Sequence, residues 1–259
     1  MREAPMDQAA SLRRLFGAAS LRVLPIVGSA QLTEWFARTL AAERRVVVLD
    51  HSGAEMAQAF GRPTRFDLAT MLWGDRRFED VAARVHDRLS IVPARAGLDQ
   101  YLEYARQHGI GSDSLFGGFL QLSRPAEWLV MHTRSLPLAA ELLGDAGEVV
   151  LVVEDDVEAV KNAYARIKEA VEREPGLQVR VVVKALGEAR ARVVHERIAA
   201  TTERFLGLNP QFGLALPKVL RPGTQLGARL KAALGNWQLA EFEAAPAAAP
   251  ATQSQTVAA

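Results

Sequence analysis

The sequence predicts an α/β protein built on one doubly wound, mainly parallel sheet. Short runs rich in valine and leucine recur along the chain, among them Val46 to Leu49 and Val149 to Val153. They lack the apolar–polar alternation of a strand with one wet face, so they indicate strands covered by helices on both sides. The run from Leu21 to Val27, the turn at Gly28 to Ala30 and the amphipathic stretch Thr33 to Glu43 lead into the next run. This β-loop-α-β order implies a right-handed crossover between parallel strands.

The same pattern continues to about residue 220. Apolar runs predict six further strands, two of which end at a proline, and helical spacing or composition predicts three further helices between them. The expected strands are Arg45 to Asp50, Leu89 to Val92, Trp128 to His132, Glu148 to Val153, Gln178 to Lys184 and Phe212 to Leu216, and the expected helices are Phe66 to Leu72, Val157 to Val171 and Arg190 to Phe205. We therefore expect one α/β domain over residues 20–220.

Each end of the chain differs from this domain. In residues 1–19, Asp7 is a plausible N-cap, Leu12 and Phe16 share an apolar face, and Gly17 is a stop signal, so a short helix is expected. Residues 221–243 are expected to hold one more helix, from Leu226 to Phe242. Residues 244–259 contain Ala, Pro, Gln, Ser, Thr and Val without charge, which predicts a disordered tail.

Composition narrows the class of protein. The chain has 259 residues, of which 49% are hydrophobic and 24% charged, and its formal net charge is +1. No apolar run approaches the roughly 18 to 20 residues of a membrane span, and no signal-peptide core is visible. The absence of cysteine excludes disulfides and thiolate chemistry and fits a cytoplasmic protein. Without a long basic run, nucleic acid is not an expected partner.

Several phrases resemble the MinD/ParA branch of P-loop ATPases, and they occur in the family's order. Phe66-Asp-Leu-Ala-Thr-Met-Leu-Trp-Gly, followed by Phe78-Glu-Asp-Val, resembles the stretch after the second strand. Leu89-Ser-Ile-Val-Pro-Ala-Arg-Ala-Gly resembles the family's "Val-Pro-Ala-Gly" strand, and Phe212-Gly-Leu-Ala-Leu-Pro its "Gly-x-Val-Pro" strand end. The helix phrase at Asn162-Ala-Tyr is also similar. The resemblance covers residues 20–220 and implies a P-loop NTPase fold of the MinD type.

A second resemblance lies at the N-terminus. Five residues at fixed spacing match the D-Q-A-x-x-L-R motif that precedes the ATPase domain in flagellar number regulators of the FlhG type, also called FleN or YlxH. These residues are Asp7, Gln8, Ala9, Leu12 and Arg13. The alternative is an ordinary amphipathic helix packed on its own domain.

This resemblance implies a partner, a flagellar GTPase of the signal-recognition-particle type whose hydrolysis the motif helix stimulates. GTP hydrolysis needs an oriented water and charge stabilisation. Gln8 and Leu12 lie four residues apart on one helix face, so Leu12 could dock while the Gln8 amide orients the water. Arg13 would neutralise charge or anchor the helix, and Asp7 would cap it. Flagellar switch proteins and transcription regulators are further partners consistent with the resemblance.

The nucleotide-binding residues of the MinD family are degenerate here. Its loop needs several glycines, lysines and a Ser/Thr for Mg²⁺. The corresponding stretch is Val27-Gly-Ser-Ala-Gln-Leu-Thr, where only Gly28 and Thr33 match, and no lysine precedes Lys161. Asp50 matches a strand-end aspartate, but Ser52 replaces the next acidic residue and His132 a metal-associated aspartate. We therefore expect no ATP or Mg²⁺ cofactor and no ATP hydrolysis.

Other groups of residues point more weakly to function. The five histidines show no metal-binding spacing, and the acidic run Glu154 to Asp156 suits a helix N-terminus better than a cation site. A C-terminal amphipathic helix binds the inner face of the plasma membrane in MinD-like proteins, so a weak membrane-facing stripe is considered beside the alternative of a helix packed on its own domain. That stripe is Leu226, Leu230, Leu234 and Trp237.

Three hypotheses follow. The first is a non-hydrolysing regulator of flagellum number or placement that activates a flagellar GTPase through residues 7–13. The second is an ATP-binding, membrane-associated switch of the MinD kind. The third is a non-catalytic scaffold for flagellar or transcriptional proteins. Loss of ATP binding predicts a monomer unless an interface other than the family's ATP dimer has replaced it.

Overall fold

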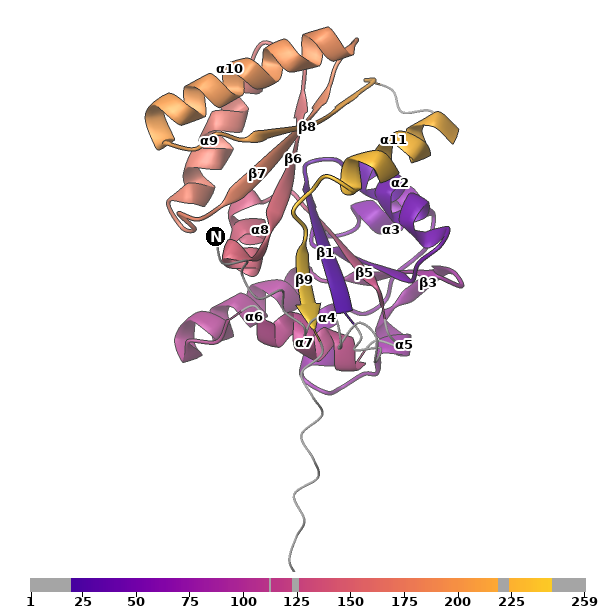
Figure 1. The fold of residues 1–259 in the computed structure, drawn as a ribbon. Helices are drawn as coiled ribbons and strands as arrows, with labels where there is room; N and C mark the ends of the chain where they lie inside the picture. The colour runs from indigo at the N-terminus through magenta and orange to yellow at the C-terminus, as the bar shows by residue number, and fades with distance from the viewer. Residues whose placement is uncertain (1–19, 112, 123–125, 219–223, 244–259) are drawn as a thin grey trace, which may run out of the picture.

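A computed structural model describes residues 20–111, 113–122, 126–218 and 224–243, and the N-terminal motif at residues 7–13 and the tail at 244–259 lie outside them. The described strands form one nine-stranded sheet in the order β3-β4-β2-β5-β1-β6-β7-β8, with β9 pairing β1 (Figure 1). Most neighbours are parallel, while β3 pairs β4 and β9 pairs β1 in the antiparallel sense. The predicted doubly wound, mainly parallel α/β fold is confirmed.

Seven of the nine described strands match the predicted runs closely, and β3 and β9 were not predicted. Where a strand is buried on both faces, continuous Val/Leu sequence is required, and all five residues of β2 are buried. The strands are β1 Ser20–Val27, β2 Val46–Asp50, β3 Ala83–His86, β4 Leu89–Pro93, β5 Trp128–Thr133, β6 Glu148–Glu154, β7 Gln178–Lys184, β8 Gln211–Leu216 and β9 Ala240–Glu243.

Helices cover both faces of the sheet. Helices α2, α3 and α11 pack on one face, and α4 to α10 pack on the other (Figure 1). Their bounds are α2 Ala30–Ala41, α3 Glu55–Phe60, α4 Leu68–Leu72, α5 Phe78–Val81, α6 Arg95–His108, α7 Asp113–Leu122, α8 Leu136–Leu143, α9 Ala159–Val171, α10 Glu188–Leu206 and α11 Thr224–Leu234, with a 3₁₀ turn η1 at Gly144–Ala146.

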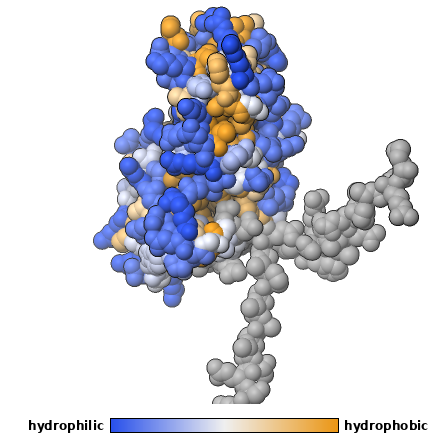
Figure 2. Space-filling model, turned by 90° about the vertical axis from the view of Figure 1, so that its left-hand side faces the viewer, coloured by the Kyte–Doolittle hydropathy of each residue, from blue (hydrophilic) through white to orange (hydrophobic). Residues whose placement is uncertain are grey.

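The surface is largely hydrophilic on the side shown in Figure 2. Hydrophobic side chains gather in the upper part of this side, where α9 and α10 lie. Among the described helices, none is both long enough and apolar enough to pass through a bilayer.

A buried ion pair fixes the sheet to the C-terminal segment. The Arg180 guanidinium on β7 donates to both carboxylate oxygens of Glu148 on β6, at 2.6 and 2.5 Å. The same carboxylate accepts a hydrogen bond from the Gln238 backbone N–H, at 3.0 Å. Arg180 also lies over the Trp237 ring, 5.7 Å from its centroid. Because Glu148 is 3% exposed, each of these donors offsets the cost of burying its charge.

The predicted helix Leu226 to Phe242 is wrong in its second half. Helix α11 ends at Leu234, the chain turns, and residues Ala240–Glu243 form β9 against the first residues of β1. This path requires close approach, because a Cβ on Gly147 would lie 2.5 Å from the Ala240 backbone nitrogen. Gly147 therefore makes room for the entry to β9.

The membrane-facing stripe expected on this segment is also corrected. The core cluster that α11 shares with α2 contains the buried side chains of Leu226, Leu230 and Trp237. Leu234 is partly buried against the same cluster. The Trp237 ring packs on Phe36 of α2 with centroids 5.4 Å apart. The apolar spacing thus reflects packing on the chain's own domain, which was the alternative reading of the stripe.

Leu230→Ala tests this burial. Because the Leu230 side chain is fully buried, its truncation is expected to lower the free energy of unfolding by about 2–5 kcal/mol, measured by urea denaturation. Gln225→Ala, at an exposed position of the same helix, should change it by no more than about 0.5 kcal/mol. Equal small effects of the two substitutions would show that Leu230 is not part of the core.

Candidate functional site

The turn between β1 and α2 is too short to cradle phosphates. Only Gly28 and Ser29 separate the end of β1 at Val27 from the start of α2 at Ala30, whereas the P-loop motif has about six residues there. Gly28 adopts φ 104° and donates its N–H to the Thr133 carbonyl, at 3.0 Å. Ser29 caps α2 by accepting from the Leu32 N–H, at 3.3 Å. The turn therefore uses its own polar groups to close the helix start.

A guanidinium lies beside this turn. A Cβ on Gly28 would be 3.4 Å from Arg166 Nη1, so the side chain of α9 reaches the end of β1. Arg166 Nη2 donates to the Arg134 carbonyl at 3.0 Å. Burial, and then the positive charge of Arg134, lower the pKa of the Arg166 guanidinium. A side chain of the protein itself thus fills space next to the shortened turn.

Asp50 is engaged in local structure. Its Oδ1 accepts from the Ser52 hydroxyl at 2.5 Å and from the Ser52 N–H at 2.9 Å. Its Oδ2 accepts from the Met56 N–H at 2.9 Å. The carboxylate, which is 2% exposed, thereby holds the start of α3 against the end of β2.

His132 forms the centre of a buried hydrogen-bonded chain. It lies on β5 in register with Ile26 of β1 and Asp50 of β2, and it is fully buried. Its Nδ1 is 3.0 Å from Thr33 Oγ1, and its Nε2 is 3.0 Å from Glu55 Oε2. Thr33 and His132 stand at the positions of the hydroxyl and the strand-end residue that would serve Mg²⁺ in an ATPase of the resembled family. Here these two side chains bond to each other.

Glu55 links this chain to the surface. Its second oxygen accepts from the Arg134 guanidinium. Burial raises the pKa of Glu55, but the hydrogen bonds and charges of Arg134 and His132 together lower it more, so its net pKa lies below the ordinary value of 4.5. Glu55 was absent from the residues selected by sequence. Only its position three residues after the Ser52 substitution could have drawn attention to it.

A second, similar chain lies beside the first. Thr133 Oγ1 is 3.2 Å from His51 Nδ1, and His51 Nε2 is 3.0 Å from Asp99 Oδ1. Since Thr133 Oγ1 also accepts from the Ser135 N–H at 3.0 Å, its proton is free to be donated to His51. Sequence reasoning did not select His51 or Asp99 because they come from different elements.

The inner members of these two chains are closed to solvent, whereas His51 and Glu55 are partly exposed. Thr33, His132 and Thr133 are fully buried, so none can reach a reacting group from solvent. Among the described residues, no cluster of three or more His, Asp or Glu side chains has the arrangement of a metal site. The residues present do not fit ATP with Mg²⁺, because the turn is short, the Thr33 hydroxyl is engaged and the sequence has no lysine before Lys161.

The acidic run after β6 is also locally engaged. Glu154 pairs with Lys184 at 2.8 Å, and Asp155 pairs with Arg190 at 2.8 Å. Asp156 accepts from the Glu158 N–H at 3.0 Å, next to the start of α9. These contacts favour the helix-start interpretation over a cation site.

The structure therefore brings Gly28, Thr33 and Asp50 to one place, the carboxyl edge of the sheet where ligands of open α/β folds bind. Residues 7–13 lie outside the described part of the chain. The residues of the expected membrane stripe are at α11 and beyond, on the core side.

Comparison by sequence finds no matching protein family and no matching curated protein. Comparison by structure finds similar folds. A plasmid partition protein from Borrelia burgdorferi has a TM-score of 0.57 at 14% identity, covering 83% of this chain and 98% of that one. Cobyrinic acid a,c-diamide synthase from Mycobacterium smegmatis has a TM-score of 0.58 at 17% identity, covering 83% and 94%.

A third similar structure is an ATP complex of McdA from Cyanothece, with a TM-score of 0.57 at 15% identity, covering 85% of this chain and 98% of that one. A ParA-family ATPase from Chlorobium tepidum is also similar, with a TM-score of 0.53 at 15% identity. At such identities the likeness concerns the fold alone. The chain has the fold of ParA/MinD-type P-loop ATPases.

One prediction concerns ATP. Because the turn at Gly28 is short and Thr33 is bonded to His132, ATP turnover by the purified chain should stay at the buffer background in a phosphate-release assay. Adding Mg²⁺ should not tighten binding of any adenine nucleotide in calorimetry. Turnover above background that Thr33→Ala abolishes would contradict this interpretation of the site.

Another prediction concerns pH. Because the folded-state pKa of Glu55 is lowered, its carboxylate stabilises the fold above pH 4.5, and that stability is lost as pH falls through the folded pKa. The free energy of unfolding of the wild type should therefore exceed that of Glu55→Gln near neutral pH, and the gap should narrow below pH 4.5. Glu169→Gln, which removes an exposed ion pair with Arg173, should show a small gap throughout. A gap that does not vary with pH for Glu55→Gln would disprove the assignment.

Proposed function

We propose that this chain is a regulator with a ParA/MinD-type fold that does not hydrolyse ATP and that stimulates a flagellar GTPase of the signal-recognition-particle type. Its activating element is the motif Asp7 to Arg13, and its expected role is control of flagellum number or placement. The flagellar part of this proposal rests on the sequence resemblance of that motif to the FlhG type.

The observation that carries the non-hydrolysing part is the direct contact of Thr33 with His132, at 3.0 Å. Phosphoryl transfer depends on positioning and charge stabilisation of the phosphates, which P-loop enzymes obtain from loop amides, a lysine and Mg²⁺. Here the turn has only two residues, the Thr33 hydroxyl is bonded to His132, and Glu55 is paired with Arg134. No group at this turn is therefore available to position the phosphates or to stabilise their charge. This favours a role in which the fold serves as a platform.

The chemistry would then occur in the partner's active site. A glutamine amide can both donate to and accept from a water, so Gln8 suits the task of orienting the attacking water. Leu12, four residues later on the same helix face, would bury its side chain against the partner. Arg13 would pair with a phosphate group of the nucleotide or with an acidic side chain of the partner. The chain would then promote GTP hydrolysis in its partner without an ATPase site of its own.

The test is a GTPase assay with the purified partner and the full-length chain. Gln8→Ala should reduce the stimulation by about tenfold or more, because removing one positioned hydrogen-bonding group at a transition state commonly costs that much. Gln107→Ala, an exposed position on α6, should leave stimulation unchanged. Unaltered stimulation by Gln8→Ala would rule out the proposed role of the amide.

The scaffold hypothesis gives a different outcome in the same system. A chain that still co-purifies with the GTPase after deletion of residues 1–19, yet never alters its rate, would place the function on the α/β surface. A synthetic peptide of residues 1–20 that stimulates by itself would instead support the motif as the active element.

A further inference from the structure

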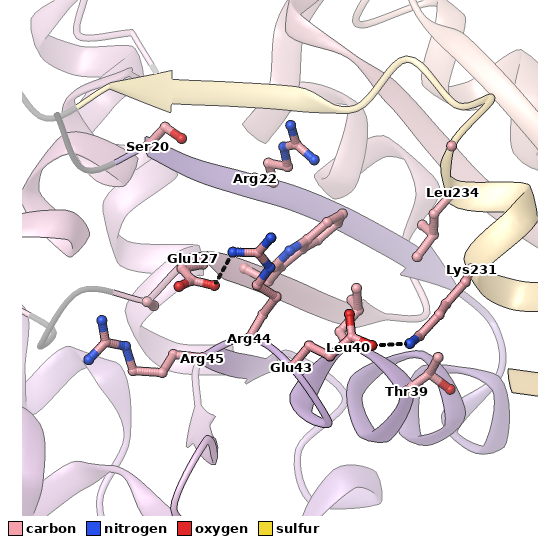
Figure 3. Close-up of a pocket in the computed structure, with 13 residues that line it drawn as sticks. Ser20, Arg22, Thr39, Leu40, Glu43, Arg44, Arg45, Glu127, Lys231 and Leu234 are labelled. Atoms are coloured by element: carbon pink, nitrogen blue, oxygen red, sulfur yellow. Dashed lines mark hydrogen bonds and ion pairs between the residues drawn. The ribbon is translucent and has the colours of Figure 1, made fainter. Parts of the chain in front are cut away.

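One cleft among the described residues lies at the opposite edge of the sheet from His132. Its volume is about 680 Å³, and it opens where β1, β2 and β5 begin, between the ends of α2 and α11 (Figure 3). That volume falls in the range of small-molecule sites. No residue of the degenerate nucleotide loop or of the carboxyl edge lines this cleft, whereas Leu234 of the expected membrane-facing stripe does.

Three arginines give the cleft its character. Arg22 lies on β1, and Arg44 and Arg45 immediately precede β2, so the strand starts place all three in the lining of the cleft. In Figure 3 the Arg44 side chain points to Glu127, while that of Arg45 extends away from Arg44 and Arg22. Arg22 meets its nearest carboxylate, Glu241, at 3.7 Å, and Arg44 meets Glu127 at 3.6 Å. Both distances exceed that of a hydrogen bond. Within the described residues, the Arg45 guanidinium has no carboxylate partner.

The remaining charges leave the cleft positive. Lys231 is held by Glu43 at 2.6 Å, where α11 meets the end of α2 (Figure 3). The lining contains four basic residues (Arg22, Arg44, Arg45 and Lys231) against two acidic ones (Glu43 and Glu127), a difference of +2, which becomes +1 when Glu241, the carboxylate beside Arg22, is also counted. A concave surface with an excess of charge of one sign concentrates ions of the opposite sign. Each of the two carboxylates faces a cation, although the buried Glu127 Oε2 makes no hydrogen bond within the described residues.

The rest of the lining suits a ligand larger than a simple anion. Leu40, Leu234 and Trp128 contribute apolar surface, and Ser20 and Thr39 contribute hydroxyl groups. Guanidinium groups recognise phosphate through paired N–H donors, while apolar walls accept the flat face of a base. A bare phosphate would leave most of the 680 Å³ unused.

We propose that this cleft binds a nucleotide without Mg²⁺, with its phosphates on Arg22, Arg44 and Arg45 and its base against Leu40 and Leu234. The proposal is independent of the GTPase role. It is also distinct from the ATP site of the resembled family, which would lie at the carboxyl edge beside Gly28. Because Ser20 lines the cleft, an occupant would lie beside the first residue of β1.

The test is calorimetric titration of the full-length chain with ATP, GTP and pyrophosphate in a buffer containing a chelator of divalent ions. At least one nucleotide should bind, and pyrophosphate should compete with it. The double variant Arg44→Gln/Arg45→Gln should raise its Kd at least tenfold. Arg192→Gln, which removes one exposed arginine of α10, should leave Kd within twofold of wild type.

Each other outcome overturns the proposal. Absence of binding by all three probes at millimolar concentration would do so, as would a wild-type Kd in the double variant. Binding that disappears in Thr33→Ala but persists in the double variant would place the nucleotide at the carboxyl edge, and would also count against the non-hydrolysing function. Matching thermal unfolding midpoints of the variants and wild type control for misfolding, and Arg44→Lys supplies a milder variant with the charge retained.

Discussion

The carboxyl edge of this protein depends on one buried contact, the hydrogen bond between Thr33 of α2 and His132 of β5. An imidazole with no exposed surface needs a partner for each nitrogen, and Thr33 and Glu55 supply them. The same contact joins α2, β5 and α3, and Arg134 extends it to the surface. A site that holds a metal and phosphates in similar folds is thereby occupied by the protein's own side chains.

The rest of the architecture keeps that edge in register. Parallel pairing sets His132 beside Asp50 and Ile26, and the Gly28 N–H bonded to the Thr133 carbonyl holds the shortened turn against β5. On the other half of the sheet, the Glu148–Arg180 pair joins β6, β7 and the segment leading to β9. Because Glu148 and Arg180 are buried together, removing either one would leave the other charge buried without its partner.

Sequence predicted the sheet better than the helices around it, for physical reasons. Buried strands such as β2 need unbroken valine and leucine, and that signal is local. Helix α8 is buried nearly all round, so it lacks the polar face that helical periodicity requires, and β9 is too short and mixed in composition to resemble a strand. At the site, the departures at Ser52 and His132 were visible in the sequence. Glu55 and Asp99 were not, because tertiary packing alone brings them to the two histidines.

A crystal structure grown with Mg²⁺ and a non-hydrolysable ATP analogue tests the central claim most directly. The closed edge predicts that Thr33 Oγ1 stays within hydrogen-bond distance of His132 Nδ1, and that the turn at Gly28 and Ser29 shows no nucleotide density. Density for the analogue over that turn, with the Thr33 hydroxyl turned from His132 to a bound Mg²⁺, would contradict it.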